Sequence, residues 1–324
     1  MRLRSFLAAT CVLASLGFLA PAGAQGSWPA KPIRMVVSSA PGSGADVMAR
    51  ALTNEMGKQM GVSFVIENKP GASQVIGMMD VVHSQPDGYT IGYGNLVALS
   101  TNKSLVANIP YDVDRDLTLL GGTWRTVNFL VVNPASPYKT VADLITAMRQ
   151  NPDKLSYASD GNGTSAHLGM ELFKHMTGTK MVHVPYKAST AGLTDLLGGQ
   201  IDAMFVNSSV VAEMVKSGRV RALGVSSLKR QPDFPQIPAI TETVPGYEVT
   251  AWAGMVAPAR LPPEIAKRFE AEIRKALAAP GMAEKCRALG VELTPNSAAE
   301  FKALVRSETA KWAEVVKVSG AKID

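Results

Sequence analysis

The segment Ile33 to Gly44 reads IRMVVSSAPGSG, and it predicts a short strand that runs into a loop of glycine and serine residues. A helix is expected directly after this loop, because Met48, Leu52 and Met56 recur at the four-residue spacing of one helix face. The segment therefore predicts a strand–loop–helix unit, which is the building block of an α/β fold.

The same order recurs along the chain. Further strands are expected at 63–67, 90–93, 128–132, 155–159, 182–185, 201–206, 221–225 and 251–257. Helices are expected at 141–150, from Leu168 to Met176, at 191–197 and over most of the tail from Pro263 onward. This alternation predicts an α/β protein with mostly parallel sheets flanked by helices.

The length favours two lobes, because 324 residues are about twice a typical domain of roughly 100–200 residues. We expect residues 25–124 and 228–324 to form the first lobe and residues 125–227 to form the second. The chain would then cross between the lobes near Gly121-Gly122 and Ser226-Ser227, and these crossings are the expected hinge.

Residues 1–24 are predicted to be a secretory signal peptide. Arg2 and Arg4 precede an apolar stretch from Phe6 to Ala20, and small residues lead to the expected cut after Ala24. The apolar stretch is shorter than the roughly 20 residues of a membrane span. We therefore expect an exported, periplasmic protein in which Cys286 has no disulfide partner.

The composition excludes several other classes of protein. Hydrophobic residues make up 46% of the chain and charged residues 19%, so a packed core is expected rather than disorder. The net charge is +6, but the basic residues are scattered, which argues against nucleic-acid binding. Two cysteines are too few for a disulfide framework, and we expect no cofactor.

Two loops share a design that suits an anion. Residues 38–44 and 159–165 each follow a strand, combine glycine with hydroxyl side chains, and lead into a helix. Glycine lets the backbone approach a ligand, and the first turn of a helix offers unpaired N–H groups with a partial positive charge. In different lobes, the loops would hold a small carboxylate across a cleft. The alternative is that they only turn the chain and cap helices through Ser43 and Thr164.

Other residues at strand ends extend this candidate site. Asn95, Asn207 and Ser208 follow strands that would end at the same sheet edges as the two loops, and for Asn95 a turn role is an equal alternative. Residues 161–166 also match the dinucleotide pattern G-x-G-x-x-G/A. The next strand ends without a carboxylate for a ribose, so we exclude NAD.

A zinc receptor and an exported hydrolase are the two alternative functions. His167, Glu171 and His175 share a helix face, and His183 is near in sequence, but H-E-x-x-H is absent and a solvated helix face is the simpler interpretation. Residues 100–103 match S-x-x-K, but the companion motifs K-T-G and S-D-N and a G-x-S-x-G elbow are missing. We therefore predict no catalytic residue.

The sequence resembles the periplasmic solute receptors of tripartite tricarboxylate transporters, called Bug receptors. The resemblance runs from Trp28 to the C-terminal helix, with landmarks WPAKPIR at 28–34, PGSGAD at 41–46, ENKPGA at 67–72, PDGYT at 86–90, PYD at 110–112, HVPYK at 183–187, DLLGGQID at 195–202 and WAG at 252–254. It implies a two-lobed type II periplasmic binding protein fold and a carboxylate ligand held by loop hydrogen bonds and ordered water.

The resemblance also implies particular site residues, which are Ser39, Gly42, Ser43, Gly44 and Ala45 in the first loop and Ser159, Thr164 and Ser165 in the second. The family usually has a bulkier Phe-Pro-Pro-Gly-Gly-Gly-Thr run in the first loop. Here Ala40 stands for a proline and Ala45 for the threonine, which should enlarge or reshape the pocket. The expected ligand is a di- or tricarboxylate. Because the smaller residues at positions 40 and 45 leave more space, a larger or aromatic dicarboxylate is also a candidate.

The resemblance further implies a membrane partner. A receptor of this kind passes its ligand to the permease subunits of the transporter, and a sensory role, in which the loaded receptor reports to a membrane kinase, is the alternative. We expect the receptor to be a monomer.

Overall fold

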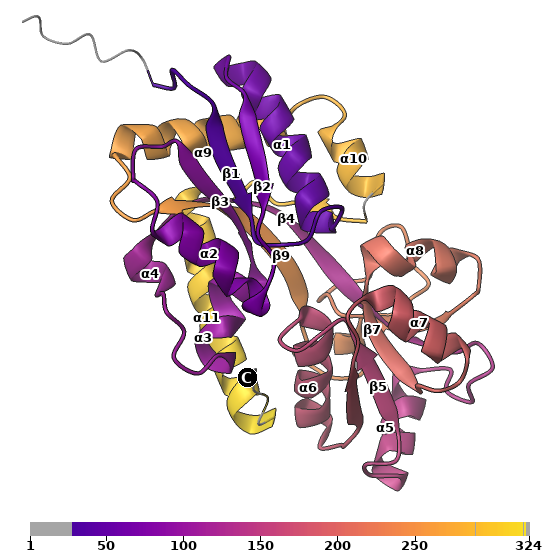
Figure 1. Cartoon of the computed structure of the whole chain (residues 1–324). Coiled ribbons are helices and arrows are strands. Elements are labelled where there is room, and N and C mark those ends of the chain that lie inside the picture. The colour runs from indigo at the N-terminus through magenta and orange to yellow at the C-terminus, as the bar shows by residue number, and fades with distance from the viewer. Residues whose placement is uncertain (1–27, 289, 320, 322–324) are drawn as a thin grey trace, which may run out of the picture.

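The computed structural model describes residues 28–288, 290–319 and 321. The expected signal peptide, residues 1–24, lies outside the described residues. Figure 1 shows two lobes, with α1 in one and α5 in the other. Within the described residues, no helix combines the length and the apolar character that a membrane span requires.

The first lobe is built on three parallel strands in the order β2-β1-β3, which are β1 (Ile33–Val37), β2 (Phe64–Asn68) and β3 (Thr90–Asn95). Helix α1 (Gly44–Met60) packs on this sheet through Met48, Leu52 and Met56, which are all at most 1% exposed. The predicted strand–loop–helix unit and its buried helix face are therefore confirmed.

The first lobe also contains shorter segments and a C-terminal part. Before the chain leaves the lobe it forms η1 (Ala72–Gln74), α2 (Val75–Val82), the π-helical turn η2 (Val97–Thr101), α3 (Asn102–Leu105) and α4 (Val113–Asp116). After it returns it forms α9 (Pro263–Leu277), α10 (Met282–Ala288), β10 (Glu292–Leu293) and α11 (Ala298–Ser319).

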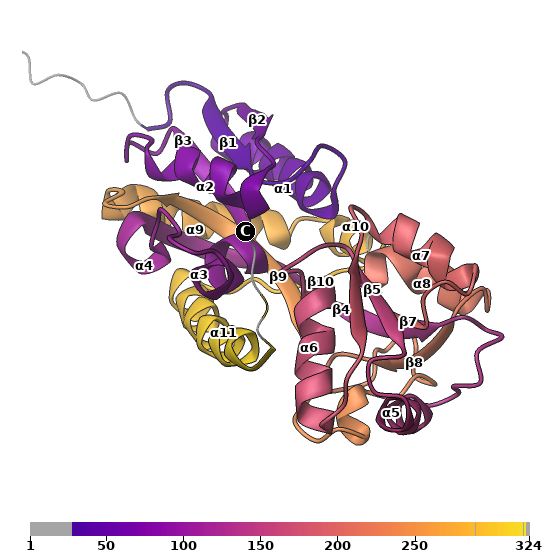
Figure 2. The same ribbon diagram turned by 60° about the horizontal axis from the view of Figure 1, so that its bottom comes forward.

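The second lobe has its own parallel strands in the order β7-β5-β6, which are β5 (Ser156–Ser159), β6 (Val182–Pro185) and β7 (Ala203–Asn207). Strand β8 (Arg221–Val225) pairs with β4 (Leu117–Val132). Figure 2 shows the helices around this sheet, which are α5 (Val141–Gln150), α6 (Ser165–Thr177), α7 (Ser189–Leu197) and α8 (Ser208–Lys216). Residues of α5 and α6 share one buried cluster, and residues of α7 and α8 share another.

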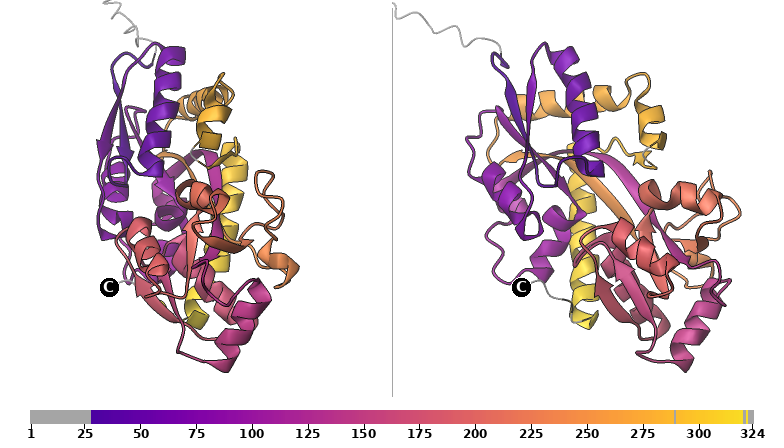
Figure 3. Two further views of the ribbon diagram at one scale, coloured as in Figure 1. Left: turned by 90° about the vertical axis from the view of Figure 1, so that its right-hand side faces the viewer. Right: turned by 45° about the vertical axis from the view of Figure 1, so that its right-hand side comes forward.

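Two long strands connect the lobes (Figure 3), and they are β4 (Leu117–Val132) and β9 (Thr250–Pro258). Strand β4 pairs with β9 up to Val127 and with β7 from Asn128 onward, and we propose that the chain crosses between these two residues. The two-lobed α/β architecture is confirmed. The expectation of mostly parallel sheets holds within each lobe, whereas the connecting strands pair antiparallel, because the chain leaves along β4 and returns along β9.

The segment 228–249, including η3 (Ile240–Glu242), packs on the second lobe rather than the first. Phe234 and Ile237 share a buried cluster with Phe129, and the Tyr247 ring stacks on Phe205 at 6.1 Å between ring centroids. These apolar side chains therefore pack on the second lobe, although they follow Ser226-Ser227 in the sequence. We therefore propose that the return crossing lies between residues 249 and 250 instead of near residue 227.

Ser226 lies where the two crossings meet. Its hydroxyl accepts a hydrogen bond from the backbone N–H of Asn128 at 2.8 Å and donates one to the backbone carbonyl of Val249 at 2.5 Å. Gly121 and Gly122 lie instead at two register shifts between β4 and β9 inside the first lobe. Ser226, the first residue of the predicted hinge pair Ser226-Ser227, thus bonds to both connecting segments. That the pair acts as a hinge stays a prediction.

Helix α11 links the two lobes from the outside. It packs on β4, on η2 and on α6 of the second lobe, and Figure 3 shows it extending along that lobe. Its fully buried Phe301 ring lies against Trp252, with 5.7 Å between ring centroids, and against Gly254. The lobes therefore share a continuous hydrophobic cluster beside the crossing strands.

Candidate functional site

The strand registers show that the carboxyl ends of the two parallel strand sets face each other. In the first lobe, Asn95 at the end of β3 pairs with Ala253, near the start of β9, where the chain arrives from the second lobe. In the second lobe, Asn207 at the end of β7 pairs with Asn128, the first residue of β4 in that lobe. Because β1 is parallel to β3, and β5 to β7, residues 38–44 (loop 1) and 159–165 (loop 2) lie on facing edges.

The two lobes touch at this edge. The Thr101 hydroxyl of η2, which follows β3, lies 3.4 Å from the Gly163 carbonyl of loop 2, to which it donates. Thr101 is fully buried. The sequence contains no signal for this contact, because it joins two segments that are more than sixty residues apart.

Loop 1 is shaped by its own side chains. Ser43 is the N-cap of α1 and accepts a hydrogen bond from the Asp46 amide at 3.3 Å, so the capping role is confirmed. Gly42 has a φ of +77°, which glycine adopts without strain. The Ser39 carbonyl accepts a hydrogen bond from the Asn68 amide group at 3.0 Å. Gly44 and Ala45 begin α1, and amides of a first helical turn have no partner inside their helix.

The buried carboxylate of Asp46 fixes the conformation of loop 1 through hydrogen bonds. This carboxylate, only 3% exposed, accepts hydrogen bonds from the Gly42 amide, the Asn68 amide group and the Arg50 guanidinium at 2.9–3.0 Å. Burial acts to raise the pKa of Asp46, but these hydrogen bonds outweigh burial and keep that pKa below its usual value. Asp46 is therefore an internal anchor of loop 1.

Loop 2 has a matching construction. Thr164 is the N-cap of α6, accepting from the His167 amide at 3.3 Å and donating to the Gly161 carbonyl at 2.9 Å. The hydroxyl of Ser159, which is fully buried, lies 3.2 Å from the Gly161 amide, from which it accepts. Ser165 is the first residue of α6. Since both hydroxyls have partners inside the loop, the first-turn amides are the donors that loop 2 offers to a ligand.

The three added residues differ in what they do. Asn95 accepts hydrogen bonds from the amides of Val97 and Ala98 at 3.0 and 3.4 Å, so its oxygen caps the following turn. The Ser208 hydroxyl donates to the Gly290 carbonyl at 2.5 Å. The Oδ1 atom of Asn207 is buried without a hydrogen-bond partner. Of the three, Asn207 is the one that still has an acceptor to offer.

The histidines do not gather around a metal position, and the expected solvated helix face is wrong for two of its three residues, because His167 and Glu171 are buried. His167 stacks on His183, Glu171 accepts hydrogen bonds from Tyr157 and Lys174, and His175 is exposed. Within the described residues, no group of three or more His, Cys, Asp or Glu side chains could hold a metal ion. Cys286 is buried, and burial raises the pKa of its thiol to about 11.

Several buried polar atoms near the facing edges have no hydrogen-bond partner. They belong to the Ser38 hydroxyl after β1, both side-chain atoms of Asn128 on β4, Asn207 after β7 and Oδ1 of Asp160 in loop 2. Burial also raises the pKa of Asp160. Buried polar groups are nearly always paired with protein or ordered water, so these atoms indicate a position for water or ligand. Sequence reasoning placed Ser38 and Asp160 in the two candidate loops without singling them out, and it missed Asn128, because side-chain direction cannot be derived from residue order.

A strained turn adds a third segment at the first-lobe edge. Ala72, Ser73 and Gln74 follow β2 with φ values of 44°, 48° and 73°, a left-handed conformation that non-glycine side chains rarely adopt. The Asn102 amide group holds the Ser73 carbonyl at 2.8 Å. Strain of this kind is often found at functional sites. The sequence carries no signal for it, because no glycine marks these three positions.

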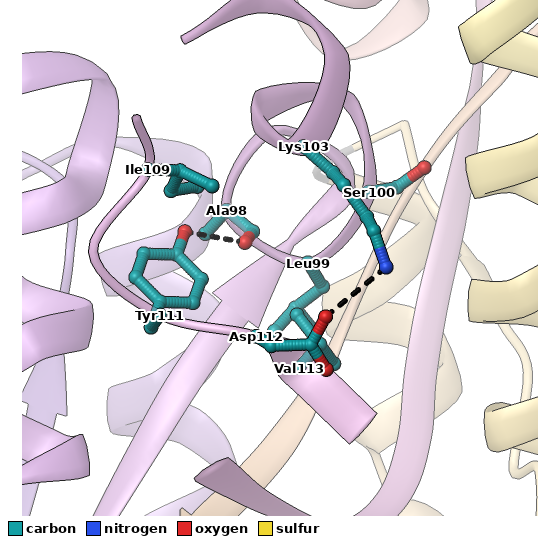
Figure 4. A pocket seen from close by; sticks show the side chains of 8 residues that line it. All are labelled: Ala98, Leu99, Ser100, Lys103, Ile109, Tyr111, Asp112 and Val113. Carbon is teal, nitrogen blue, oxygen red and sulfur yellow. Dashed lines mark hydrogen bonds and ion pairs between the residues drawn. The ribbon is translucent and has the colours of Figure 1, made fainter. Parts of the chain in front are cut away.

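Two cavities lie away from the facing edges. One, of about 10 Å³, is lined by Ala98, Leu99, Ser100, Lys103, Ile109, Tyr111, Asp112 and Val113 (Figure 4). The Tyr111 hydroxyl donates to the Ala98 carbonyl there, and Lys103 pairs with Asp112. A space of this size holds about one water molecule. The other, of about 610 Å³, is an open hollow between α1 and β2 around Gly57 and Phe64. Neither is the candidate site.

Comparisons with known proteins agree with this geometry. The model of the tripartite tricarboxylate transporter family receptor matches residues 48–321. BugT of Bordetella pertussis is 33% identical over 313 residues, which cover 96% of this chain and 96% of BugT. An R. palustris protein solved with adipate has a TM-score of 0.82 and 33% identity, covering 91% of this chain and 100% of its own. MatC from Rhodopseudomonas palustris, solved with bound malate, has a TM-score of 0.78 and 26% identity, covering 89% and 99%.

These matches decide between the classes of protein considered above. The family and its structural neighbours are solute-binding receptors of the periplasm and not enzymes, so the hydrolase hypothesis loses its support. The family model spans most of the chain, from within α1 to the end of α11, and so includes α6 and parts of both lobes. The chain belongs to the tripartite tricarboxylate transporter receptor family.

Proposed function

We propose that this protein is an extracytoplasmic receptor that holds a small carboxylate between loop 1 and loop 2 and delivers it to a tripartite tricarboxylate transporter permease. The observation that carries the proposal is the placement of two helix N-termini, those of α1 and α6, on the facing edges of the two lobes. Each offers unpaired amides and the positive end of a helix dipole, which favour an anion.

The residues around the two loops suit a ligand held by dipoles rather than by side-chain charge. The nearby carboxylate of Asp46 is already satisfied inside loop 1. The unpartnered atoms of Ser38, Asn128 and Asn207 supply further donors and acceptors, directly or through ordered water. The relatives solved with adipate and malate support a dicarboxylate as the ligand class.

The ligand's size follows from loop 1. Ala40 and Ala45 carry the smallest side chains after glycine, and Ala45 lies in the first turn of α1. We infer that the space next to this turn accepts a longer or aromatic dicarboxylate. The candidate contacts are Ser39, Gly42, Ser43, Gly44 and Ala45 with Asn95 in the first lobe, and Ser159, Thr164, Ser165, Asn207 and Ser208 in the second.

Capture would favour one arrangement of the lobes. A carboxylate bound to both helix N-termini stabilises the closed arrangement over the open one, because only the closed form makes both sets of contacts. The permease then distinguishes the loaded receptor by that arrangement. In this proposal the receptor acts as a monomer in the periplasm after cleavage following Ala24, and a membrane kinase is the alternative reader of the closed form.

A melting-temperature panel followed by calorimetric titration tests the proposal. Adipate, malate, an aromatic dicarboxylate, a monocarboxylate and zinc are added separately to the purified protein. We expect at least one dicarboxylate to raise the melting temperature in a concentration-dependent way. Stabilisation by zinc alone, or by no carboxylate in the panel, would contradict it.

A matched pair of variants locates the site. Thr164→Ala and Thr140→Ala each remove an N-cap threonine in the second lobe, of α6 and α5 respectively, and each should cost about 1 kcal/mol of stability. Only Thr164→Ala should also weaken dicarboxylate binding, because only α6 points its N-terminus at the first lobe. Equal affinities of the two variants would remove loop 2 from the site.

A further inference from the structure

Two stacked histidines support loop 2 from behind. The His167 ring of α6 and the His183 ring of β6 lie parallel, with 4.1 Å between ring centroids and 11° between planes. Tyr157 of β5 continues the stack on His183 at 4.7 Å. His167 is 5% exposed and Tyr157 is fully buried, whereas His183 is half-buried.

Each imidazole is bonded to loop 2 through one nitrogen. The Gly163 amide donates to Nδ1 of His167 at 3.0 Å, so that nitrogen carries no proton and the ring is neutral. Nε2 of His183 lies 2.7 Å from the Ser159 hydroxyl, which in turn accepts from the Gly161 amide. Gly161 has a φ of +127° and Gly163 a φ of +79°. The two rings therefore hold the part of loop 2 that has no regular backbone conformation.

The charged groups around the stack do not favour protonation of these rings. Burial is the main cause that lowers the pKa of both His167 and His183 to about 4, and the Lys174 ammonium acts in the same direction. For His183 the neighbouring His167 lowers the pKa further, and Glu171 opposes this. Both rings are therefore neutral at the ordinary pH of the periplasm.

The other titratable groups near the two histidines lie on β5, loop 2 and α11. Tyr157 on β5 donates its hydroxyl to Glu171, and Asp160 is the titratable residue of loop 2 itself. Strand β7 and the turn η2 contain no titratable side chain. On α11, which packs against α6, the carboxylate of Glu308 is paired with Lys311.

We propose that His167 and His183 are positioning residues of the carboxylate site. His167 acts as a neutral acceptor for the Gly163 amide, His183 bonds to the Ser159 hydroxyl, and together they hold loop 2 so that the first-turn amides of α6 face the ligand. This inference rests on the proposed function. A proton on Nδ1 of His167 would face the Gly163 N–H, break that bond and place two cationic rings in contact if both were charged. Ligand retention then becomes sensitive to acid.

The first test is rescue by a variant that keeps the acceptor. In His167→Asn, the side-chain oxygen takes the position of Nδ1 but does not titrate, whereas His167→Leu has no acceptor. We expect His167→Leu to weaken adipate binding at pH 7.5 by about tenfold and to speed hydrogen exchange of the Gly163 amide by a similar factor, as one lost hydrogen bond implies. His167→Asn should stay close to wild type in both measurements.

A stability-matched control separates positioning from general weakening of α6. Tyr247→Phe removes a hydrogen bond to the Gly169 carbonyl of the same helix without touching loop 2. It should lower the melting temperature but leave the Gly163 exchange rate and the affinity unchanged. The proposal is wrong if His167→Asn binds as weakly as His167→Leu, or if Tyr247→Phe weakens binding equally.

The second test is a pH profile that needs no destabilised variant. Protonation of a group with a pKa of about 4 lowers affinity by about fourfold at pH 3.5 when the bound form excludes the proton. The ratio of wild-type to His167→Asn affinity for adipate should therefore fall by that factor between pH 7 and pH 3.5, because protonation of adipate affects both equally. A constant ratio would overturn the acid sensitivity. If adipate does not bind at all, the Gly163 exchange rates still decide whether His167 positions the loop.

Discussion

Replacing Asp46 by asparagine should show how loop 1 is held. The carboxylate accepts three hydrogen bonds, from Gly42, Asn68 and Arg50, and its buried position excludes water as a substitute. In Asp46→Asn, one oxygen becomes an NH₂ group, so at least one donor loses its acceptor. Hydrogen bonds to a charged group are worth about 1.5–3 kcal/mol each, so we expect a loss of about 2–4 kcal/mol in the free energy of unfolding.

The assay is denaturant unfolding followed by circular dichroism at pH 7.5, with Arg50→Met as the control. The Arg50 side chain is 51% exposed, so water can replace its guanidinium at the carboxylate, and we expect this variant to lose less stability than Asp46→Asn. Because the pKa of Asp46 is lowered from 3.8, its stabilisation is present above that pH and is lost as the pH falls through the folded-state pKa. The Asp46→Asn variant should lack that part of the acid dependence.

The same variant should also bind its dicarboxylate more weakly, since a neutral amide holds the turn at Gly42 before α1 less firmly than the carboxylate does. The reasoning is refuted if Asp46→Asn unfolds within about 0.5 kcal/mol of wild type, which is the usual range for surface substitutions. It is equally refuted if Arg50→Met costs as much as Asp46→Asn, because the ion pair would then be the anchor.

Four further variants test the fold around the site. Gly254→Ala should destabilise the protein by about 1–3 kcal/mol in the same unfolding assay, because a Cβ there would collide with the Phe301 ring of α11 and with the Gly121 carbonyl of β4; an unchanged midpoint would show that both can move away. Ser226→Ala should cost about 1–3 kcal/mol, since it leaves a buried amide and a buried carbonyl of the two crossings unpaired, and wild-type stability would show that water replaces the hydroxyl. Gln74→Gly should be more stable than Gln74→Val by about 1–2 kcal/mol, because only glycine adopts a φ of 73° freely; the reverse order would mean that the turn rearranges.

Local patterns in the sequence predict local structure well. The spacing of Met48, Leu52 and Met56 predicts the buried face of α1, and the serine before it is the N-cap that the loop composition indicates. Thr164 and α6 follow the same rule. These features depend on contacts within a few residues, which is why periodicity and capping chemistry are enough to find them.

Long-range geometry is where sequence reasoning stops. The spacing of His167, Glu171 and His175 correctly places them on one helix but does not show that His167 pairs with a ring from β6, or that Glu171 pairs with a phenol from β5. The crossing that we propose between residues 249 and 250 differs from the predicted one for a similar reason. The residues of 228–249 are loop-like in sequence, and only their packing on the second lobe shows where they belong.

A crystal structure of the protein with a bound dicarboxylate, selected by the melting-temperature panel, tests the central claim most directly. We expect one carboxylate group within hydrogen-bond distance of the first-turn amides of α6, with the rest of the ligand reaching the first turn of α1, directly or through ordered water. A ligand seated in the hollow between α1 and β2, or held by one lobe through side-chain charges alone, would contradict the account.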